Sequence, residues 1–301
     1  MTAQSGRPLA ARLRSFGLTV RHAAEWLMLR ACFALVRVIP ERAMVRAMGR
    51  AWRFFGPMNK RHRRAMDNLA RAFPEMGEAE RDTLARRMWE NLGRVAAETL
   101  QLDRVTQDPS RFEFDVSEVG GLVGDGGAVV VSMHAGNWEV TTLGALELGW
   151  SPIGVYKALS NARSDTLLHS LRAPLYPGGL LPKGHETARR VLSKVRRGGR
   201  VAMLADLRDP RGAVIPFFGH DAYATTYPAM VACAAGVPLV AARVLRLPDD
   251  RFRISAVIVD VPRTGDRKAD ALALTQAYHG LFEQWIRAAP DQWMWIMRKW
   301  V

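Results

Sequence analysis

Apolar residues recur along the chain with two different periods. Up to about residue 110 they follow helical spacing, as in the amphipathic segment between Glu78 and Gln101. From about residue 111, short β-branched runs alternate with helical segments. We therefore predict a basic helical region over residues 1–110 and an α/β domain over residues 111–301.

The second part alternates predicted strands with predicted helices. The runs interpreted as strands are 111–116, 128–133, 153–157, 201–206, 239–247 and 252–260. The segments with helical spacing are 138–148, 161–173, 185–198, 226–235 and 269–288. Because strands joined through helices pair mostly in parallel, the predicted fold class is α/β, with a mixed, mainly parallel central sheet flanked by helices.

One N-terminal segment, residues 22–39, is predicted to form an apolar helix that ends before Pro40. It contains Glu25, Arg30 and Arg37, whereas a transmembrane helix needs about 20 apolar residues with few charges. It also lacks the uninterrupted apolar run and cleavage site of a signal peptide. We favour a membrane-associating helix that lies in the membrane surface with its arginines snorkelling, and an ordinary core helix stays open as the alternative.

Composition narrows the classes of partner. Hydrophobic residues make up 49% of the chain and charged residues 24%, which suits a folded protein with a core, and the net charge is +14. The charge favours an anionic partner, and nucleic acid, an anionic membrane face and phosphorylated small molecules all fit. Cys32 and Cys233 stand alone in apolar stretches, so the sequence predicts neither a disulfide framework nor a metal site.

The stretch from Gly126 to Glu139 carries the clearest chemistry. A β-branched run leads into His134 at a predicted strand tip, and a turn containing glycine follows. Asn137 is expected to cap the next helix, with Glu139 in its first turn. We expect Glu139 to accept a hydrogen bond from one imidazole nitrogen of His134 and leave the other nitrogen free as a base. A structural histidine that caps a strand is the alternative.

A second pair of the same spacing, His62 and Asp67, lies in a basic helical segment and is interpreted as part of a solvated face. A further predicted strand ends in Asp206, next to Arg208 and Arg211, which is a candidate site for an anionic or polyhydroxyl substrate. A surface ion-pair cluster is the alternative. Thr225 either binds a head group or belongs to a helix N-cap.

Other features carry two interpretations each. Lys157, Arg172 and Lys183 lie near predicted strand or helix ends, where they could bind phosphate. Near the C-terminus, Trp293, Trp295 and Trp300 suit either a membrane interface or packing onto the core.

Several short segments occur in a distinctive order: Asp67-Asn68-Leu69, Ala72-Phe73-Pro74-Glu75, Asn91-Leu92-Gly93-Arg94, His134 to Glu139, Val155-Tyr156-Lys157 with Asn161, Pro216-Phe217-Phe218-Gly219, Ala224-Thr225-Thr226 and Asp291-Gln292-Trp293-Met294-Trp295. In their order and spacing, over about residues 22–301, the chain resembles the lipid A biosynthesis late acyltransferase family. This family belongs to the lysophospholipid acyltransferase superfamily, and its relatives include the phosphatidylinositol mannoside acyltransferase.

The resemblance implies an acyl chain moved from acyl carrier protein or coenzyme A to a hydroxyl of a membrane glycolipid, most simply a lipid A precursor. It implies His134 as general base and Glu139 as the carboxylate that orients it, with Arg172 and Asp206 also functional. Backbone N–H groups at residues 137–139, or Arg172, are expected to stabilise the oxyanion. No bound cofactor or metal is expected.

Substrate contacts are expected at Lys157, Arg172, Lys183, Asp206, Arg208 and Thr225, with Phe217 and Phe218 lining an acyl channel. Relatives often carry arginine where this chain has Lys157 and Lys183, and lysine loses the bidentate fork. Many relatives carry a second acidic residue where this chain has Arg208. The resemblance places a monomer at the cytoplasmic face of the bacterial inner membrane, with no nucleic-acid partner.

Three other functions compete with this one. The acceptor could be another phospholipid or glycolipid, such as phosphatidylinositol mannoside. The chain could also be a non-enzymatic basic protein that binds membranes or nucleic acid, but this class does not explain a histidine and a carboxylate at a strand tip. A hydrolase that uses His134 to activate water would release free fatty acid.

Overall fold

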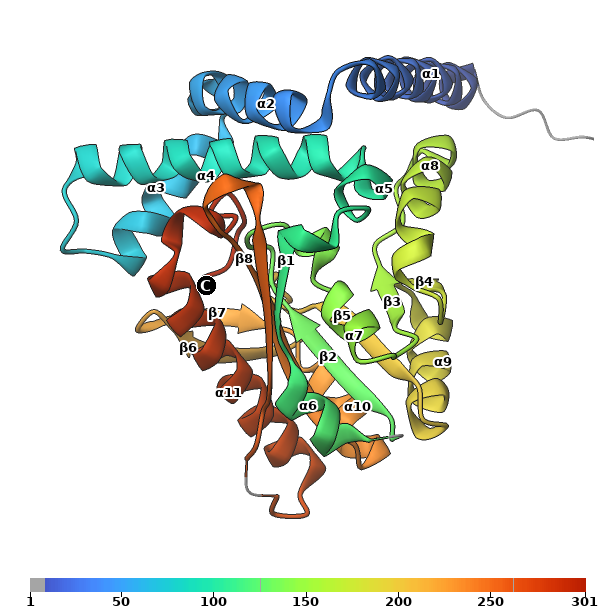
Figure 1. The fold of residues 1–301 in the computed structure, drawn as a ribbon, viewed down its shortest axis with the longest axis vertical. Helices are drawn as coiled ribbons and strands as arrows, with labels where there is room; N and C mark the ends of the chain where they lie inside the picture. Colours follow the sequence, from blue (N-terminus) through green and yellow to red (C-terminus); the bar gives the residue numbers. More distant parts are fainter. Residues whose placement is uncertain (1–8, 125, 262) are drawn as a thin grey trace, which may run out of the picture.

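The computed structural model describes residues 9–124, 126–261 and 263–301, and Figure 1 shows their α/β fold. The first part is helical, as predicted, and its helices are α1 (Leu9–Val38), α2 (Glu41–Phe55), α3 (Arg61–Ala72), α4 (Glu78–Thr99) and α5 (Leu102–Val105), with a 3₁₀ turn at Gly56–Met58. In the described residues the first strand begins at Phe112.

The central sheet has seven strands in the order β1-β9-β8-β2-β5-β3-β4. They are β1 (Phe112–Asp115), β2 (Ala128–Ser132), β3 (Ile153–Tyr156), β4 (Leu180–Pro182), β5 (Arg200–Leu204), β8 (Leu239–Arg246) and β9 (Phe252–Ile258). All neighbours pair in parallel except β8 and β9, which are antiparallel. The prediction of a mixed, mainly parallel sheet flanked by helices is confirmed.

The sequence missed three strands. β4 has only three residues and ends in Pro182. β6 (Ala213–Phe217) and β7 (His220–Ala224) form a separate antiparallel hairpin. Pro216 lies inside β6 and proline argues against a strand, so this hairpin could not be read from residue pattern alone.

Helices cover both faces of the sheet. The remaining ones are α6 (Ser117–Val123), α7 (Leu143–Glu147), α8 (Ala162–Arg172), α9 (His185–Arg196), α10 (Tyr227–Ala235) and α11 (Arg267–Ala288). Val129 and Val131 of β2 point to the face packed by α9, α10 and α11, where the main core lies. Val130 and Ser132 point to the opposite face, which α6 and α7 cover and which holds the site described below.

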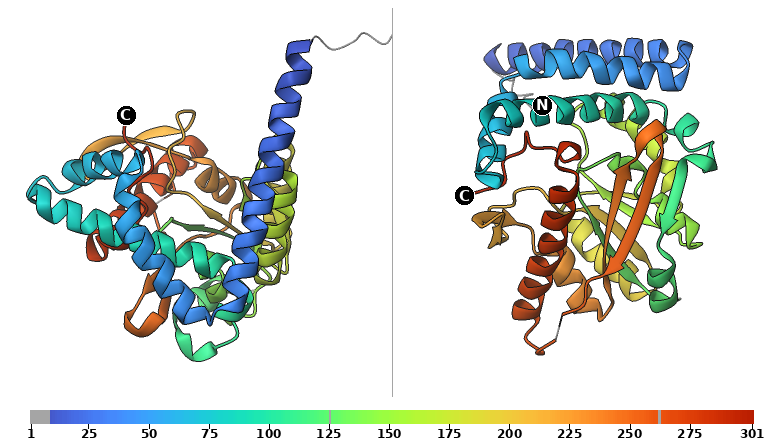
Figure 2. Two further views of the ribbon diagram at one scale, coloured as in Figure 1. Left: turned by 90° about the horizontal axis from the view of Figure 1, so that it is seen from above. Right: turned by 60° about the vertical axis from the view of Figure 1, so that its left-hand side comes forward.

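α1 and α2 lie against the outside of the molecule, above α4 in Figure 1, and diverge as a V in Figure 2. α1 is not a core helix, because Leu27 is 67% exposed and Met28 is 66% exposed. Its contact with the domain includes a hydrogen bond from Asn161 Nδ2 to the His22 carbonyl oxygen at 2.8 Å. Within the described ranges, no helix combines the length and the apolar character needed to cross a bilayer. Membrane association of this region stays a prediction.

The C-terminal tryptophans belong to the core. Trp293 is 1% exposed, Trp295 is 0% exposed and Trp300 is 6% exposed. They pack edge-on around Phe217 and Phe218, so the choice between a membrane interface and core packing falls to core packing.

The prediction that His62 lies on a solvated face is wrong. The His62 ring is largely buried and lies 3.2 Å from an oxygen of Asp82 through Nε2, while Nδ1 accepts from the Trp89 indole at 3.3 Å. His62 belongs to α3 and both partners belong to α4, so the ring joins two helices. Helix packing was not visible in the spacing between His62 and Asp67.

A buried ion pair ties α4 to the sheet. Arg246 donates from both Nη atoms to the two oxygens of Glu98, at 2.7 Å each, and Glu98 is 0% exposed. Burial alone would lower the pKa of Arg246, but Glu98 raises it above its usual value. Asn137 Nδ2 also donates to Glu98 at 2.8 Å, and Asn91 Nδ2 donates to the Gly136 carbonyl at 3.0 Å. This network therefore holds the turn that follows β2.

Candidate active site

The turn after β2 places His134 at the carboxyl end of the sheet. Gly136 has a φ of 57°, and an added Cβ would lie 2.3 Å from the Val244 carbonyl oxygen, so glycine is required there. Asn137 caps the following segment, as predicted, by accepting from the Glu139 N–H at 3.2 Å. The helix predicted over 138–148 is instead a 3₁₀ turn at Trp138–Val140 followed by the short α7.

Asp206, rather than Glu139, holds the His134 ring. His134 Nδ1 lies 2.7 Å from Asp206 Oδ1, and the backbone N–H of His134 donates to Asp206 Oδ2 at 2.9 Å. The sheet register explains the pairing, because Ser132 of β2 lies opposite Leu204 of β5. His134 and Asp206 each follow that pair by two residues, on parallel strands about 4.8 Å apart.

The environment of Asp206 keeps it ionised. Burial alone would raise its pKa, but His134 and the indole N–H of Trp293, which donates to Oδ2 at 2.9 Å, lower the pKa to about 2. An ionised carboxylate accepts hydrogen bonds only, so it fixes the ring proton on Nδ1 of His134. Nε2 then carries a lone pair and can act as a base.

Behind this pair lies a second buried one, outside the cavity. Lys299 is 1% exposed and its Nζ lies 3.0 Å from His279 Nε2. His279 in turn bonds the Thr275 carbonyl through Nδ1 at 2.8 Å. Burial lowers the pKa of Lys299 to about 8, and burial with the neighbouring Lys299 lowers that of His279 well below its usual value.

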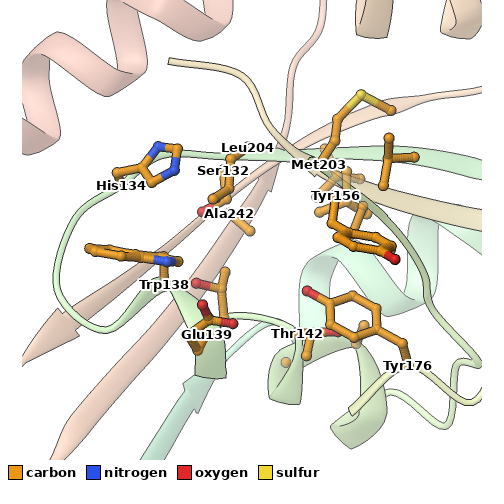
Figure 3. A pocket seen from close by; sticks show the side chains of 18 of the residues that line it. Ser132, His134, Trp138, Glu139, Thr142, Tyr156, Tyr176, Met203, Leu204 and Ala242 are labelled. Carbon is orange, nitrogen blue, oxygen red and sulfur yellow. The ribbon is translucent and has the colours of Figure 1, made fainter. Parts of the chain in front are cut away.

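Glu139 takes a different partner from the one predicted. Arg172 of α8 donates from Nε to Glu139 Oε2 at 2.8 Å, and from Nη2 to Oε1. Burial alone would lower the pKa of Arg172, but Glu139 raises it above its usual value. Figure 3 shows the Trp138 ring between His134 and Glu139, which explains why the expected bond between them does not form.

His134 and Glu139 line one cavity of about 620 Å³ (Figure 3). Its inner part runs between the sheet and α6 and α7, and apolar side chains line it there: Val119, Val130, Ala145, Leu148, Trp150, Val240 and Ile254. A volume of this size suits a small molecule or a flexible chain. The cavity therefore offers a base and an apolar slot in the same space.

Cationic side chains lie at the outer part of this cavity. Lys157, Lys183 and Arg208 line it and are exposed, and Arg208 stacks on Tyr223 with Cζ 4.5 Å from the ring centre. Arg172 and Thr225 line the same cavity. The structure thus brings together predicted site residues from the loops after β3, β4 and β5, and from the end of α8.

Two sets of predicted substrate contacts were placed wrongly. Phe217 is 1% exposed and Phe218 is 4% exposed. Both pack among the C-terminal tryptophans rather than along the cavity, so they do not line an acyl channel. Asp206 is 3% exposed and binds His134, so it does not face a substrate as expected. The residue pattern does not show that Phe217, Phe218 and Asp206 are buried, so it does not exclude them from contact with a substrate.

The sequence also missed residues that shape the site. Trp293 bonds Asp206, while Ser132 and Thr141 line the cavity from β2 and from the segment before α7. The alternation along β2 could have identified Ser132, because it lies on the same face as His134. Nothing in the sequence pattern connects Trp293 to Asp206.

Comparison with protein families places the chain. The family model described as bacterial lipid A biosynthesis acyltransferase matches residues 13–301, which is nearly the whole chain. The comparison with curated proteins finds no match.

Proposed function

The chain belongs to the bacterial lipid A biosynthesis acyltransferase family, and from this we propose that it moves a fatty acyl chain from an acyl thioester to a hydroxyl of a lipid A precursor. One observation carries the proposal for the reaction. A histidine fixed by an ionised carboxylate lines a cavity that is apolar inside and cationic outside. Acyl chain, reacting carbonyl and anionic head group each find a matching environment along this cavity.

In the proposed reaction, His134 Nε2 takes the proton of the acceptor hydroxyl while its oxygen attacks the thioester carbonyl carbon. The new C–O bond forms and the carbonyl electron pair moves onto its oxygen. As the C=O bond forms again, the C–S bond breaks and the imidazolium returns the proton to the departing thiolate. Asp206 stabilises the imidazolium in between.

Glu139 and Arg172 act in this proposal as a fixed pair on the cavity wall. Their bidentate contact, with Glu139 6% exposed, holds the end of α8 against the segment after β2. The remaining N–H groups of Arg172 are oriented by that contact. They suit a phosphate or sugar oxygen of the substrate better than direct contact with His134.

The donor and the acceptor are both anionic in this proposal. Coenzyme A and the prosthetic group of acyl carrier protein carry phosphate, and a lipid A precursor carries phosphates on its sugars. Lys157, Lys183 and Arg208 are exposed cations beside the cavity and supply the complementary charge. Another glycolipid acceptor, such as phosphatidylinositol mannoside, would use the same cations. No bound cofactor or metal takes part.

The acceptor is identified by lipid mass spectrometry. A strain that lacks this gene is expected to accumulate a lipid A precursor short of one acyl chain, and the purified protein should restore that chain from acyl carrier protein or coenzyme A. If lipid A is unchanged and a phospholipid or mannoside instead lacks an acyl chain, that lipid is the acceptor. Release of free fatty acid with no acylated product would identify a hydrolase instead.

We also propose that α1 and α2 bind the membrane surface, at the cytoplasmic face of the inner membrane, and that the protein works there as a monomer. Leu27, Met28 and Leu35 of α1 are more than half exposed, as are Phe54 and Phe55 of α2. Basic side chains lie among them, including Arg30 and Arg50, which are exposed. Apolar side chains next to cations are typical of a helix that lies in a bilayer surface.

Vesicle binding tests this membrane surface. The full chain should sediment with vesicles containing phosphatidylglycerol, and the Leu27→Ser/Met28→Ser variant should bind at least about tenfold more weakly, because two apolar side chains no longer enter the bilayer. Val214→Ser is the matched control, since Val214 is 49% exposed but lies in the β6–β7 hairpin. Equal binding by the double variant and the control would argue against this surface.

A further inference from the structure

Three residues that line the cavity, Ser132, Thr141 and Tyr227, have a hydroxyl without a hydrogen-bond partner in the described protein, and Ser132 and Thr141 are the buried residues among them. Ser132 is 6% exposed and Thr141 is 8% exposed, and both side chains line the cavity that holds His134. Neither Oγ of Ser132 nor Oγ1 of Thr141 bonds to any described protein atom. A buried hydroxyl left without a partner destabilises the folded protein. Each of these hydroxyls therefore has an unused donor hydrogen at the wall of the apolar part of the cavity.

Their position relative to His134 is set by β2. Ser132 is the last residue of β2 and His134 follows two residues later in the turn, and both side chains line the same cavity. In Figure 3, Ser132 lies on the sheet next to Leu204 of β5 and Ala242 of β8, beside His134. Thr141 follows the 3₁₀ turn at Trp138–Val140 and lines the cavity from that segment. The two hydroxyls thus line the same cavity as His134.

Several N–H groups near His134 already have partners. The Glu139 N–H donates to Asn137 Oδ1 at 3.2 Å. Arg172 directs Nε and Nη2 to the Glu139 carboxylate, and the His134 N–H donates to Asp206. A negative charge that develops on a carbonyl oxygen next to His134 needs donors whose hydrogen is not already engaged, and a hydroxyl can rotate its hydrogen toward that oxygen.

We propose that the hydroxyls of Ser132 and Thr141 bind the carbonyl oxygen of the acyl thioester and stabilise its negative charge when the acceptor adds. This inference rests on the acyl transfer proposed above. When the acceptor oxygen forms its bond to the carbonyl carbon and His134 takes the proton, the carbonyl electron pair moves to the oxygen that both hydroxyls contact. The same hydroxyls release that charge when the C=O bond forms again and the C–S bond breaks.

The test compares kcat, KM and thermal stability for the full-length wild type and single variants, with myristoyl-CoA and a bisphosphorylated lipid A precursor as probes. Ser132→Ala should lower kcat by about 10²-fold, and Thr141→Val should also lower it, with KM nearly unchanged, because the charge exists only in the transition state. Thr141→Ser keeps the hydroxyl and should retain most of the activity. The melting temperature of the Ala and Val variants should hold or rise, since an unpaired hydroxyl is removed.

A matched control is Thr275→Val, which removes a 0% exposed hydroxyl outside this cavity, and it should leave kcat unchanged. Wild-type levels of kcat in both Ser132→Ala and Thr141→Val would overturn the inference. A loss of kcat that appears only with a 3-hydroxyacyl thioester would also overturn it, because the two hydroxyls would then bind the hydroxyl group of the acyl chain instead of the thioester carbonyl. If the wild type itself transfers no acyl group, the proposed function fails, and that outcome is distinct from these.

Discussion

Asp206→Asn is expected to lower kcat for acyl transfer by about 10²–10⁴-fold, close to the loss in His134→Ala. Asp206 accepts from both the ring and the backbone N–H of His134. An asparagine amide no longer fixes the ring proton on Nδ1 or stabilises the imidazolium, so Nε2 loses its role as base. The fold should persist, because the amide keeps the size of the carboxylate and an oxygen for the Trp293 indole.

Steady-state kinetics of the two single variants and the double variant check this prediction. The double variant should be no slower than His134→Ala alone, since residues that act as one unit are not additive. Asp260→Asn, at an exposed position outside the cavity, should match the wild type. Glu139→Gln should cost less than Asp206→Asn. The reverse order, with Glu139→Gln inactive and Asp206→Asn active, would restore Glu139 as the residue that orients His134.

Arg246→Met is expected to lower the free energy of unfolding by about 3–5 kcal/mol. It would leave the Glu98 carboxylate, which is 0% exposed, without its cationic partner in the protein interior. Asn137 and Asn91 bind the same network and hold the turn after β2, so activity should fall as well. The loss arises from the uncompensated charge rather than from the missing bond itself.

Urea denaturation of matched variants separates these effects. Glu98→Gln/Arg246→Met removes both charges and should recover part of the stability lost in the single variant. Arg253→Met breaks an exposed ion pair with Glu113, whose side chains are 48% and 34% exposed, and should cost less than about 1 kcal/mol. If Arg246→Met were no more destabilised than Arg253→Met, the buried pair of Arg246 and Glu98 would contribute no more to stability than an exposed ion pair.

Local and long-range interactions separate most clearly at the end of β2, around His134. The strand before His134 and the turn after it can be predicted from the sequence, because β-branched runs, a glycine turn and a capping asparagine act over a few residues. The carboxylate that binds the His134 ring cannot be predicted in this way. Asp206 is far from His134 in sequence and reaches the ring only because β5 lies beside β2 in the sheet. The burial of single side chains also depends on tertiary packing. The sequence therefore predicts Phe217 and Phe218 in an acyl channel and does not decide between a membrane interface and core packing for the C-terminal tryptophans.

The amino-acid sequence by itself determined the local structure of this protein: the helical first part, the alternation of strands and helices, and the position of His134 at the end of a strand. Local backbone preference and the period of apolar residues suffice for these features. Only the tertiary structure decided that Asp206 orients His134, that Glu139 pairs with Arg172, and that an apolar cavity opens beside them. Strand order and packing set those contacts, and they depend on residues from many parts of the chain at once.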